Sequence, residues 1–177
     1  GSLEAACAVK KMIEAGRFHG TVRYYGCPAE ESGAGKGFMV RAGVFHDVDI
    51  CLTWHPTDQN GVMQNALANM RMFFEFHGIS AHAGAKPYMG RSALDAVELT
   101  NVGCNYLREH IIPEARLHYA VTNTGGTAPN IVQAYAEEIY CIRAPKLDQL
   151  EEIFGRVCNV ARGAALMTDT RLNIRVV

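Results

Sequence analysis

No apolar run in the 177-residue sequence approaches the roughly 20 residues that a membrane-spanning helix requires. The N-terminal residues also lack the basic-then-apolar pattern of a secretory signal peptide. Neither sign of charge dominates, because 17 Lys and Arg residues are mixed along the chain with 18 Asp and Glu residues. Proteins that bind nucleic acid or anionic membranes usually carry a basic patch. The sequence therefore predicts a protein with neither of those partners.

The six cysteines lack the C-x-x-C spacing of zinc knuckles and redox pairs. Most of them lie inside apolar runs, where a free thiol packs as a small hydrophobic side chain. They are Cys7, Cys27, Cys51, Cys104, Cys141 and Cys158. We therefore expect free thiols and a reduced, cytoplasmic compartment.

The composition is that of a globular protein, with 49% hydrophobic and 20% charged residues. This length accommodates one ordinary domain, or a small domain and part of another. The run Asp58-Gln59-Asn60-Gly61 interrupts the pattern of the chain with turn-forming residues. We therefore predict two parts, 1–62 and 63–177.

In the first part, residues 3–16 are rich in helix formers and Gly16 ends the pattern. Residues 21–27 and 48–54 are typical of strands, and residues 34–43 can form a short helix between them. Strand, helix and strand within so few residues predict a βαβ unit with parallel strands. Functional groups collect beyond the carboxyl ends of such strands.

In the second part, the segment around residues 70–77 alternates as in a half-buried strand. One side carries Met70, Met72, Phe74 and Phe76, and the other side carries Arg71, Glu75 and His77. A helix is predicted over about 91–111 and another from Pro145, and further strands at about 116–123, 135–143 and 172–176. The order βαββαβ is that of the ferredoxin-like fold. The fold class predicted for the whole chain is therefore α/β, a βαβ piece followed by a ferredoxin-like domain.

Two acids and one histidine follow the predicted strands of the first part. Glu30 and Glu31 are adjacent carboxylates on a loop, so that one can bind a metal while the other accepts a proton from water. His55 follows the second strand directly, and a neutral imidazole is a common metal ligand. The alternative is that the acids are solvated at a helix start and that His55 is structural. One parallel crossover would bring Glu31 and His55 to the same rim, yet a catalytic zinc site usually takes three protein ligands.

Other polar segments carry weaker signals. The run 33–37 is not a phosphate-binding loop, because no Gly stands five residues before Gly35 and no Ser or Thr follows Lys36. His82 lies in a loop rich in Gly and Ala, where a polar histidine is commonplace. Residues 125–130 can be an ordinary connection between two strands.

Five short motifs, in this order, resemble the M20 metallopeptidase family and above all its amidohydrolase branch. They are Gly26-Cys27-Pro28-Ala29-Glu30-Glu31, Trp54-His55-Pro56, Gly78-Ile79-Ser80-Ala81-His82-Ala83, Gly90-Arg91-Ser92-Ala93-Leu94-Asp95-Ala96-Val97 and Asn123-Thr124-Gly125-Gly126-Thr127-Ala128-Pro129-Asn130. Within that branch, the last two motifs are similar to the p-aminobenzoyl-glutamate hydrolases. The resemblance extends over nearly all of residues 3–177.

The resemblance implies a role for each matching residue. Glu30 would be the general base, Glu31 a ligand of one metal ion and His55 a ligand of the other. His82 would stabilise the oxyanion, reaching the active site of the other protomer in dimeric members, and Asn130 would hold the carboxylate side of the substrate. Polarisation by a metal and a donor to the developing oxyanion are the main electrostatic terms of such a reaction.

The resemblance further implies a two-metal amidohydrolase, with Zn or Mn, that cleaves an N-acyl or N-aroyl amino acid such as p-aminobenzoyl-glutamate. Residues 1–62 would be part of the catalytic domain and residues 63–177 a lid that forms a homodimer. A homologous second subunit is compatible with the same resemblance.

Two metal-binding segments of the family do not occur in the sequence. One should precede residue 3 and the other should follow residue 177, so we expect a fragment that is inactive alone and holds no metal tightly. The competing hypothesis is a non-enzymatic, ferredoxin-like module that dimerises or binds a small ligand.

Overall fold

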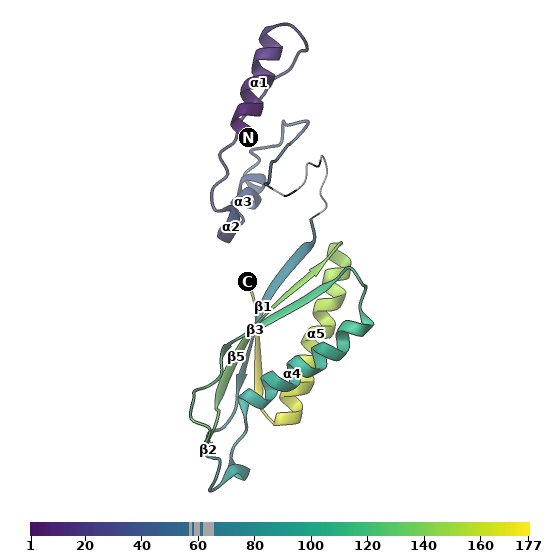
Figure 1. The fold of residues 1–177 in the computed structure, drawn as a ribbon. Helices are drawn as coiled ribbons and strands as arrows, with labels where there is room; N and C mark the ends of the chain where they lie inside the picture. Colours follow the sequence, from purple (N-terminus) through teal and green to yellow (C-terminus); the bar gives the residue numbers. More distant parts are fainter. Residues whose placement is uncertain (57, 59–60, 62–65) are drawn as a thin grey trace. The chain divides into compact units, whose positions relative to one another are not determined.

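The structure, a computed structural model, describes residues 1–56, 58, 61 and 66–177. The chain divides into two compact units, Gly1–Val62 and Met63–Val177, both drawn in Figure 1. The roles predicted for them, a partial catalytic domain and a lid, stay predictions. No helix within the described residues has both the length and the apolar character needed to cross a bilayer.

The first unit contains three helices within its described residues: α1 (Ser2–Glu14), α2 (Glu30–Gly33) and α3 (Gly35–Arg41). Helix α1 ends as predicted, because Gly16 adopts a φ of 69° and the Arg17 N–H donates to the Met12 carbonyl. This left-handed residue beyond the last turn satisfies carbonyls that the helix leaves unpaired. The short helix predicted over 34–43 is confirmed as α3.

The strands predicted at 21–27 and 48–54 are wrong, because the described residues of the first unit contain no strand. A parallel strand needs hydrogen-bonded neighbours and a cover on both faces. Neither is present around Ile50, Leu52 and Trp54, which are 76%, 92% and 63% exposed. Arg23 of the first segment instead forms a two-pronged ion pair with Asp47, the residue before the second segment, at 2.8 and 2.7 Å. The predicted parallel βαβ pairing is therefore not formed.

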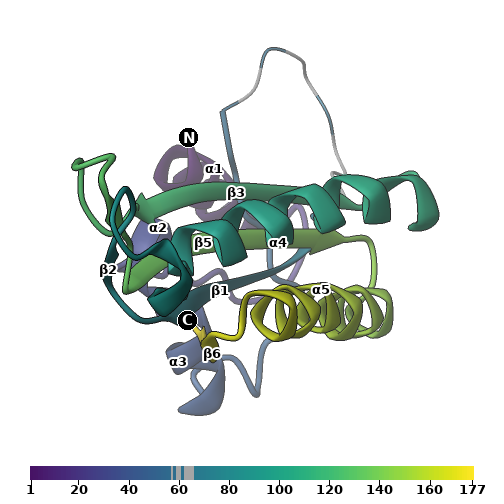
Figure 2. The same ribbon diagram turned by 90° about the horizontal axis from the view of Figure 1, so that it is seen from below.

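The second unit is a four-stranded antiparallel sheet with two helices on one face (Figure 2). Its elements are β1 (Ala68–His77), α4 (Ala93–Leu107), β3 (Arg116–Asn123), β5 (Tyr135–Ala144), α5 (Leu147–Thr168) and β6 (Arg171–Val176). The spatial order β3-β5-β1-β6 is that of the predicted ferredoxin-like fold. Strand β3 lies at an edge, as the order βαββαβ requires.

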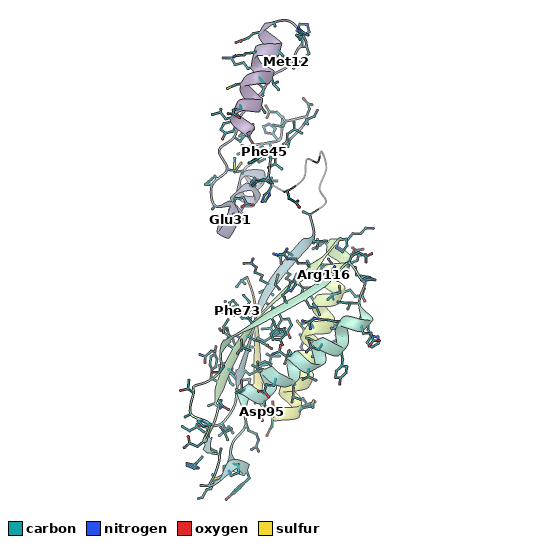
Figure 3. The ribbon with its side chains drawn as sticks, viewed as in Figure 1. Met12, Glu31, Phe45, Phe73, Asp95 and Arg116 are labelled. Atoms are coloured by element: carbon teal, nitrogen blue, oxygen red, sulfur yellow. The ribbon has the colours of Figure 1, made fainter. Side chains whose placement is uncertain are left out.

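The core lies between the sheet and the two helices. Alternate residues of β1 and β5 point toward the helices, and the register pairs Met72 with Tyr140 and Phe76 with Ala136. Helix α4 begins at Ser92, whose Oγ accepts the Asp95 N–H at 3.1 Å, and Figure 3 labels Asp95 near this end. Fully buried side chains from both layers form one cluster: Met72, Phe74, Phe76, Val97, Cys104, Tyr140, Ile142, Leu150 and Val157.

A small tip extends from the end of this unit. It contains a two-stranded ladder, β2 (Ala81–His82) with β4 (Ile131–Val132), and the short 3₁₀ helix η1 (Pro87–Met89). A second 3₁₀ helix, η2 (Arg108–His110), continues α4 at its other end. At the base of the tip, a Cβ on Gly78 would lie 1.9 Å from the Arg91 carbonyl oxygen, so only glycine fits there.

Candidate functional site

Glu30 and Glu31 occupy the first turn of α2, from which Figure 3 shows Glu31 labelled. Ala29 and Ala34, on either side of this helix, have φ values of 54° and 47°. Few residues other than glycine adopt this left-handed conformation, which limits α2 to one tight turn. Both carboxylates are exposed to solvent. A shallow hollow beside Glu30 is lined by Ala34, Gly35, Lys36 and Gly37.

His55 is exposed at the end of the segment that was predicted as a strand. Its Nδ1 lies 2.8 Å from the carbonyl oxygen of Pro56. A carbonyl can only accept, so Nδ1 carries the proton and the lone pair of the neutral ring is on Nε2. This is the arrangement of a metal-ligating histidine, in which the second ring nitrogen donates to a carbonyl.

The described residues do not assemble a metal centre. No group of three or more His, Cys, Asp or Glu side chains in residues 1–56, 58, 61 and 66–177 lies close enough to hold an ion. Glu31 and His55 supply two ligand types suited to zinc or manganese, but a catalytic site needs at least three protein ligands. The described side chains of this chain therefore do not fit a complete metal site.

The tip of the second unit brings together His82 and Asn130, which are distant in sequence. In the β2–β4 ladder His82 lies directly opposite Ile131, and the Ala83 N–H donates to the Asn130 carbonyl at 2.8 Å. Residues directly opposite in an antiparallel pair have side chains on the same face. The exposed imidazole thus lies next to Ile131, with Asn130 one residue away.

The connection that leads to Asn130 is shaped by two glycines. Gly125 and Gly126 have φ values of 80° and 124°, and a Cβ on Gly125 would lie 2.2 Å from the Tyr135 carbonyl oxygen. The Asn123 side chain accepts the Gly125 N–H at 2.8 Å. This turn requires glycine and defines the path of the chain into β4.

The imidazole of His82 is oriented by the backbone that follows it. Its Nδ1 accepts the N–H groups of Gly84 at 3.2 Å and Ala85 at 3.1 Å. The ring therefore has its neutral-state proton on Nε2, on the side away from these amides. These contacts favour opposite neutral tautomers for the two histidines. His82 carries its proton on Nε2, whereas His55 carries its proton on Nδ1 and has a lone pair on Nε2.

A buried polar cluster under the sheet was not among the features predicted from the sequence. Glu138 is fully buried, and neither of its carboxyl oxygens has a hydrogen-bond partner in the described part of the chain. Burial raises its pKa to about 8, while the neighbouring Asn101 acts in the opposite direction. Burial likewise raises the pKa of the Cys104 thiol to about 11. Glu138 has the same parity as Ala136, Tyr140 and Ile142, and that alternation could have revealed it.

Comparison with known proteins gives relatives along nearly the whole chain, although no family model matches. One subunit of the p-aminobenzoyl-glutamate hydrolase of Escherichia coli is 55% identical over 172 residues, 97% of this chain and 36% of the relative. The Xaa-Arg dipeptidase of Mus musculus is 34% identical over 149 residues, 84% of this chain and 34% of the relative. The chain thus spans about a third of the length of these relatives.

Solved structures agree with these relatives. The aminobenzoyl-glutamate utilization protein of Klebsiella pneumoniae superposes with a TM-score of 0.61 at 29% identity, covering 85% of this chain and 39% of that one. A hydantoinase/carbamoylase family amidase of Burkholderia ambifaria superposes with a TM-score of 0.57 at 14% identity, covering 64% of this chain and 28% of that one. At that identity, the second comparison shows a shared fold only.

Proposed function

Because the chain belongs to the family of the p-aminobenzoyl-glutamate hydrolases and related amidohydrolases, we propose that the whole protein cleaves the amide bond of an N-acyl or N-aroyl amino acid. The observation that carries this proposal is the 55% identity over 172 residues. The relative's name makes p-aminobenzoyl-glutamate the first substrate to test. The same identity to an enzyme favours hydrolysis over a non-enzymatic ferredoxin-like module.

Each candidate residue has its own proposed role in the reaction. Glu30, exposed at the start of α2, is the proposed base that takes a proton from the attacking water. His82 is the proposed donor to the oxyanion of the tetrahedral intermediate, and its Nε2–H is available for that hydrogen bond. Asn130, beside it, would bind the carboxylate of the amino acid.

A metal requirement is part of the proposal for the whole protein only. Glu31 and His55 would each supply one ligand to a pair of divalent ions, Zn or Mn, and the tautomer of His55 supports its part. The residues that the structure describes do not complete a site, so the proposal includes further ligands in the whole protein. The chain by itself should therefore be inactive.

We also propose a homodimer through β3. This edge strand contains no proline and a single charged residue, Arg116, so little protects it from pairing with another chain. Helix α4 lies over the half of the sheet nearer β3 (Figure 2) and exposes Val102 and Tyr106, which are 49% and 73% accessible. Antiparallel pairing of two copies of β3 would join the sheets around a two-fold axis, and His82 would act in the partner's active site.

The relatives include two different subunits of the p-aminobenzoyl-glutamate hydrolase of Escherichia coli. This pair of relatives supports a further proposed partner, a homologous second subunit.

All six cysteines are free, which supports the proposed reduced, cytoplasmic compartment.

The direct test is hydrolysis of p-aminobenzoyl-glutamate by the full-length protein, with its metal content measured in parallel. Release of p-aminobenzoate and glutamate that depends on bound metal would support the proposal. A metal-loaded, folded protein that cleaves no N-acyl or N-aroyl amino acid in a panel would overturn it.

A further inference from the structure

Residues 82–86 form a turn that encloses one side of the His82 ring. The N–H groups of Ala85 and Lys86 donate to the His82 carbonyl at 3.2 and 2.9 Å, which closes the backbone of the turn. The same turn directs the Gly84 and Ala85 N–H groups at Nδ1 of the imidazole. The Ala85 N–H is shared between the carbonyl and the ring, whereas that of Gly84 is used for the ring alone.

These contacts determine where the proton of the neutral imidazole resides. An N–H group can only donate, so Nδ1 must present a lone pair to both amides. A proton on Nδ1 would point at the N–H groups of Gly84 and Ala85. Two hydrogen bonds would then be lost, and three N–H groups would face one another. In an exposed loop without such contacts, the two neutral tautomers can both be populated.

Gly84 also fits closely against the ring that it orients. A Cβ at this position would lie 3.4 Å from Cε1 and 3.6 Å from Nδ1 of His82. A methyl group would meet the imidazole at ordinary contact distance, and a larger side chain would crowd it. On the other side, the β2–β4 ladder fixes the backbone of His82 opposite Ile131.

We infer that the backbone amides of Gly84 and Ala85 are positioning groups for the reaction, holding His82 as the Nε2–H tautomer. In that state the ring can donate a hydrogen bond to a developing oxyanion and cannot accept a proton at Nε2. The catalytic meaning of this inference rests on the proposed function, whereas the tautomer is a property of this chain. Preorganised donors of this kind contribute most of their effect in the transition state.

The tautomer can be measured in the 177-residue chain by long-range ¹H–¹⁵N correlation spectra of its imidazoles, with His82→Gln used for assignment. His82 should show a single Nε2–H form, and His55 should show the opposite form. The exposed His19, which makes no hydrogen bond within the described residues, serves as the internal reference for a mixture. A tautomer mixture at His82 equal to that at His19, or a proton on Nδ1, would overturn the inference.

A pair of variants isolates the Gly84 amide. Gly84→Pro removes the N–H group, whereas Gly84→Ala keeps it and adds only a methyl group near the ring. The proline variant should shift His82 toward a mixture of tautomers and the alanine variant should not; equal spectra would contradict the inference. Should the proline variant not fold, the wild-type comparison of His82 with His19 still decides the question.

Kinetics of the full-length protein separate this inference from the proposed function. Gly84→Pro should lower kcat roughly ten- to a hundredfold more than Gly84→Ala, with little change in KM. A full-length protein without any hydrolytic activity would defeat the proposed function and leave the tautomer result intact. Hydrolysis that requires His82 but is equally fast in the two Gly84 variants would defeat this inference alone.

Discussion

The hydroxyl of Tyr140 donates a hydrogen bond of 2.6 Å to Oδ1 of Asn101 beneath the sheet. This bond occupies the amide oxygen of Asn101. Burial raises the pKa of the neighbouring Glu138, and the Asn101 side chain acts in the opposite direction. The buried carboxyl group has no hydrogen-bond partner of its own among the described residues. Its charge state should therefore govern how the stability of the second unit depends on pH.

Glu138→Gln should stabilise the chain at alkaline pH. The pKa of Glu138 is raised from 4.5 to about 8 in the folded state, so the folded protein favours the neutral acid. The contribution to stability is complete below pH 4.5 and is lost as the pH rises through about 8. The full loss corresponds to roughly 5 kcal/mol, since one pKa unit is worth about 1.36 kcal/mol.

Urea unfolding of both proteins across that pH range measures the effect. The free energy of unfolding of the wild type should fall relative to that of the glutamine variant as the pH rises. Glu98→Gln, at an exposed position of α4, is the matched control and should leave the pH dependence as in the wild type. Parallel curves for wild type and Glu138→Gln would mean that the carboxyl group is solvated when charged.

Glu30→Ala should lower the turnover of the full-length protein by roughly 100- to 10,000-fold, the usual contribution of a general base, without loss of metal. Glu31→Ala, one residue further along the same exposed turn, should lower both turnover and metal content. Steady-state kinetics with elemental analysis distinguishes the two. Normal turnover in Glu30→Ala would exclude Glu30 as the base.

The 177-residue chain should dimerise at micromolar concentration, and sedimentation or light scattering will measure its mass. Replacing Val102 and Tyr106 by Glu should shift the chain toward the monomer, because both side chains lie exposed on the helix nearer to β3. Leu166 and Met167, also exposed but on α5, provide the matched control when replaced by Glu. A monomeric wild-type chain would exclude the homodimer and, with it, the action of His82 on a partner's active site.

After dialysis, the 177-residue chain should retain well under one zinc or manganese ion. Two protein ligands, Glu31 and His55, leave most coordination positions to water, and metal affinity falls accordingly. Elemental analysis of the dialysed chain measures this directly. A tightly held stoichiometric ion that is lost in His55→Ala would show that further ligands exist within the chain.

The sequence predicted the second unit well because each strand of its four-stranded sheet packs against a core within the same unit, Met63–Val177. Met72, Phe74 and Phe76 are buried, whereas the residues between them are partly exposed. A strand with one face on the core and one face turned away from it explains this alternation. The edge position of β3 followed from the order of the elements alone.

The first unit could not be predicted in the same way. Residues 48–54 have the composition of a strand, but a strand also needs a neighbour, and composition does not reveal whether one is present.

The pairing of His82 with the Asn130 region could not be predicted from local sequence patterns either. It depends on strands of two residues each, too short to leave a periodic signal. Glu138 is the opposite case, since its place in the alternation of β5 was readable from the sequence.

The tip carries its own two-stranded ladder, separate from the four-stranded sheet. It is joined to the rest of the unit at its base, where Gly78 donates to the Ala134 carbonyl and Ala93 to the Gln133 carbonyl. None of the largest fully buried side chains belongs to β2, η1 or β4. His82 and Asn130, which we propose to contact the substrate, thus lie apart from the large buried side chains that maintain the fold. Evolution or protein design could therefore replace the tip by another that keeps the hydrogen bonds at its base. Such a replacement could alter substrate preference at little cost in stability.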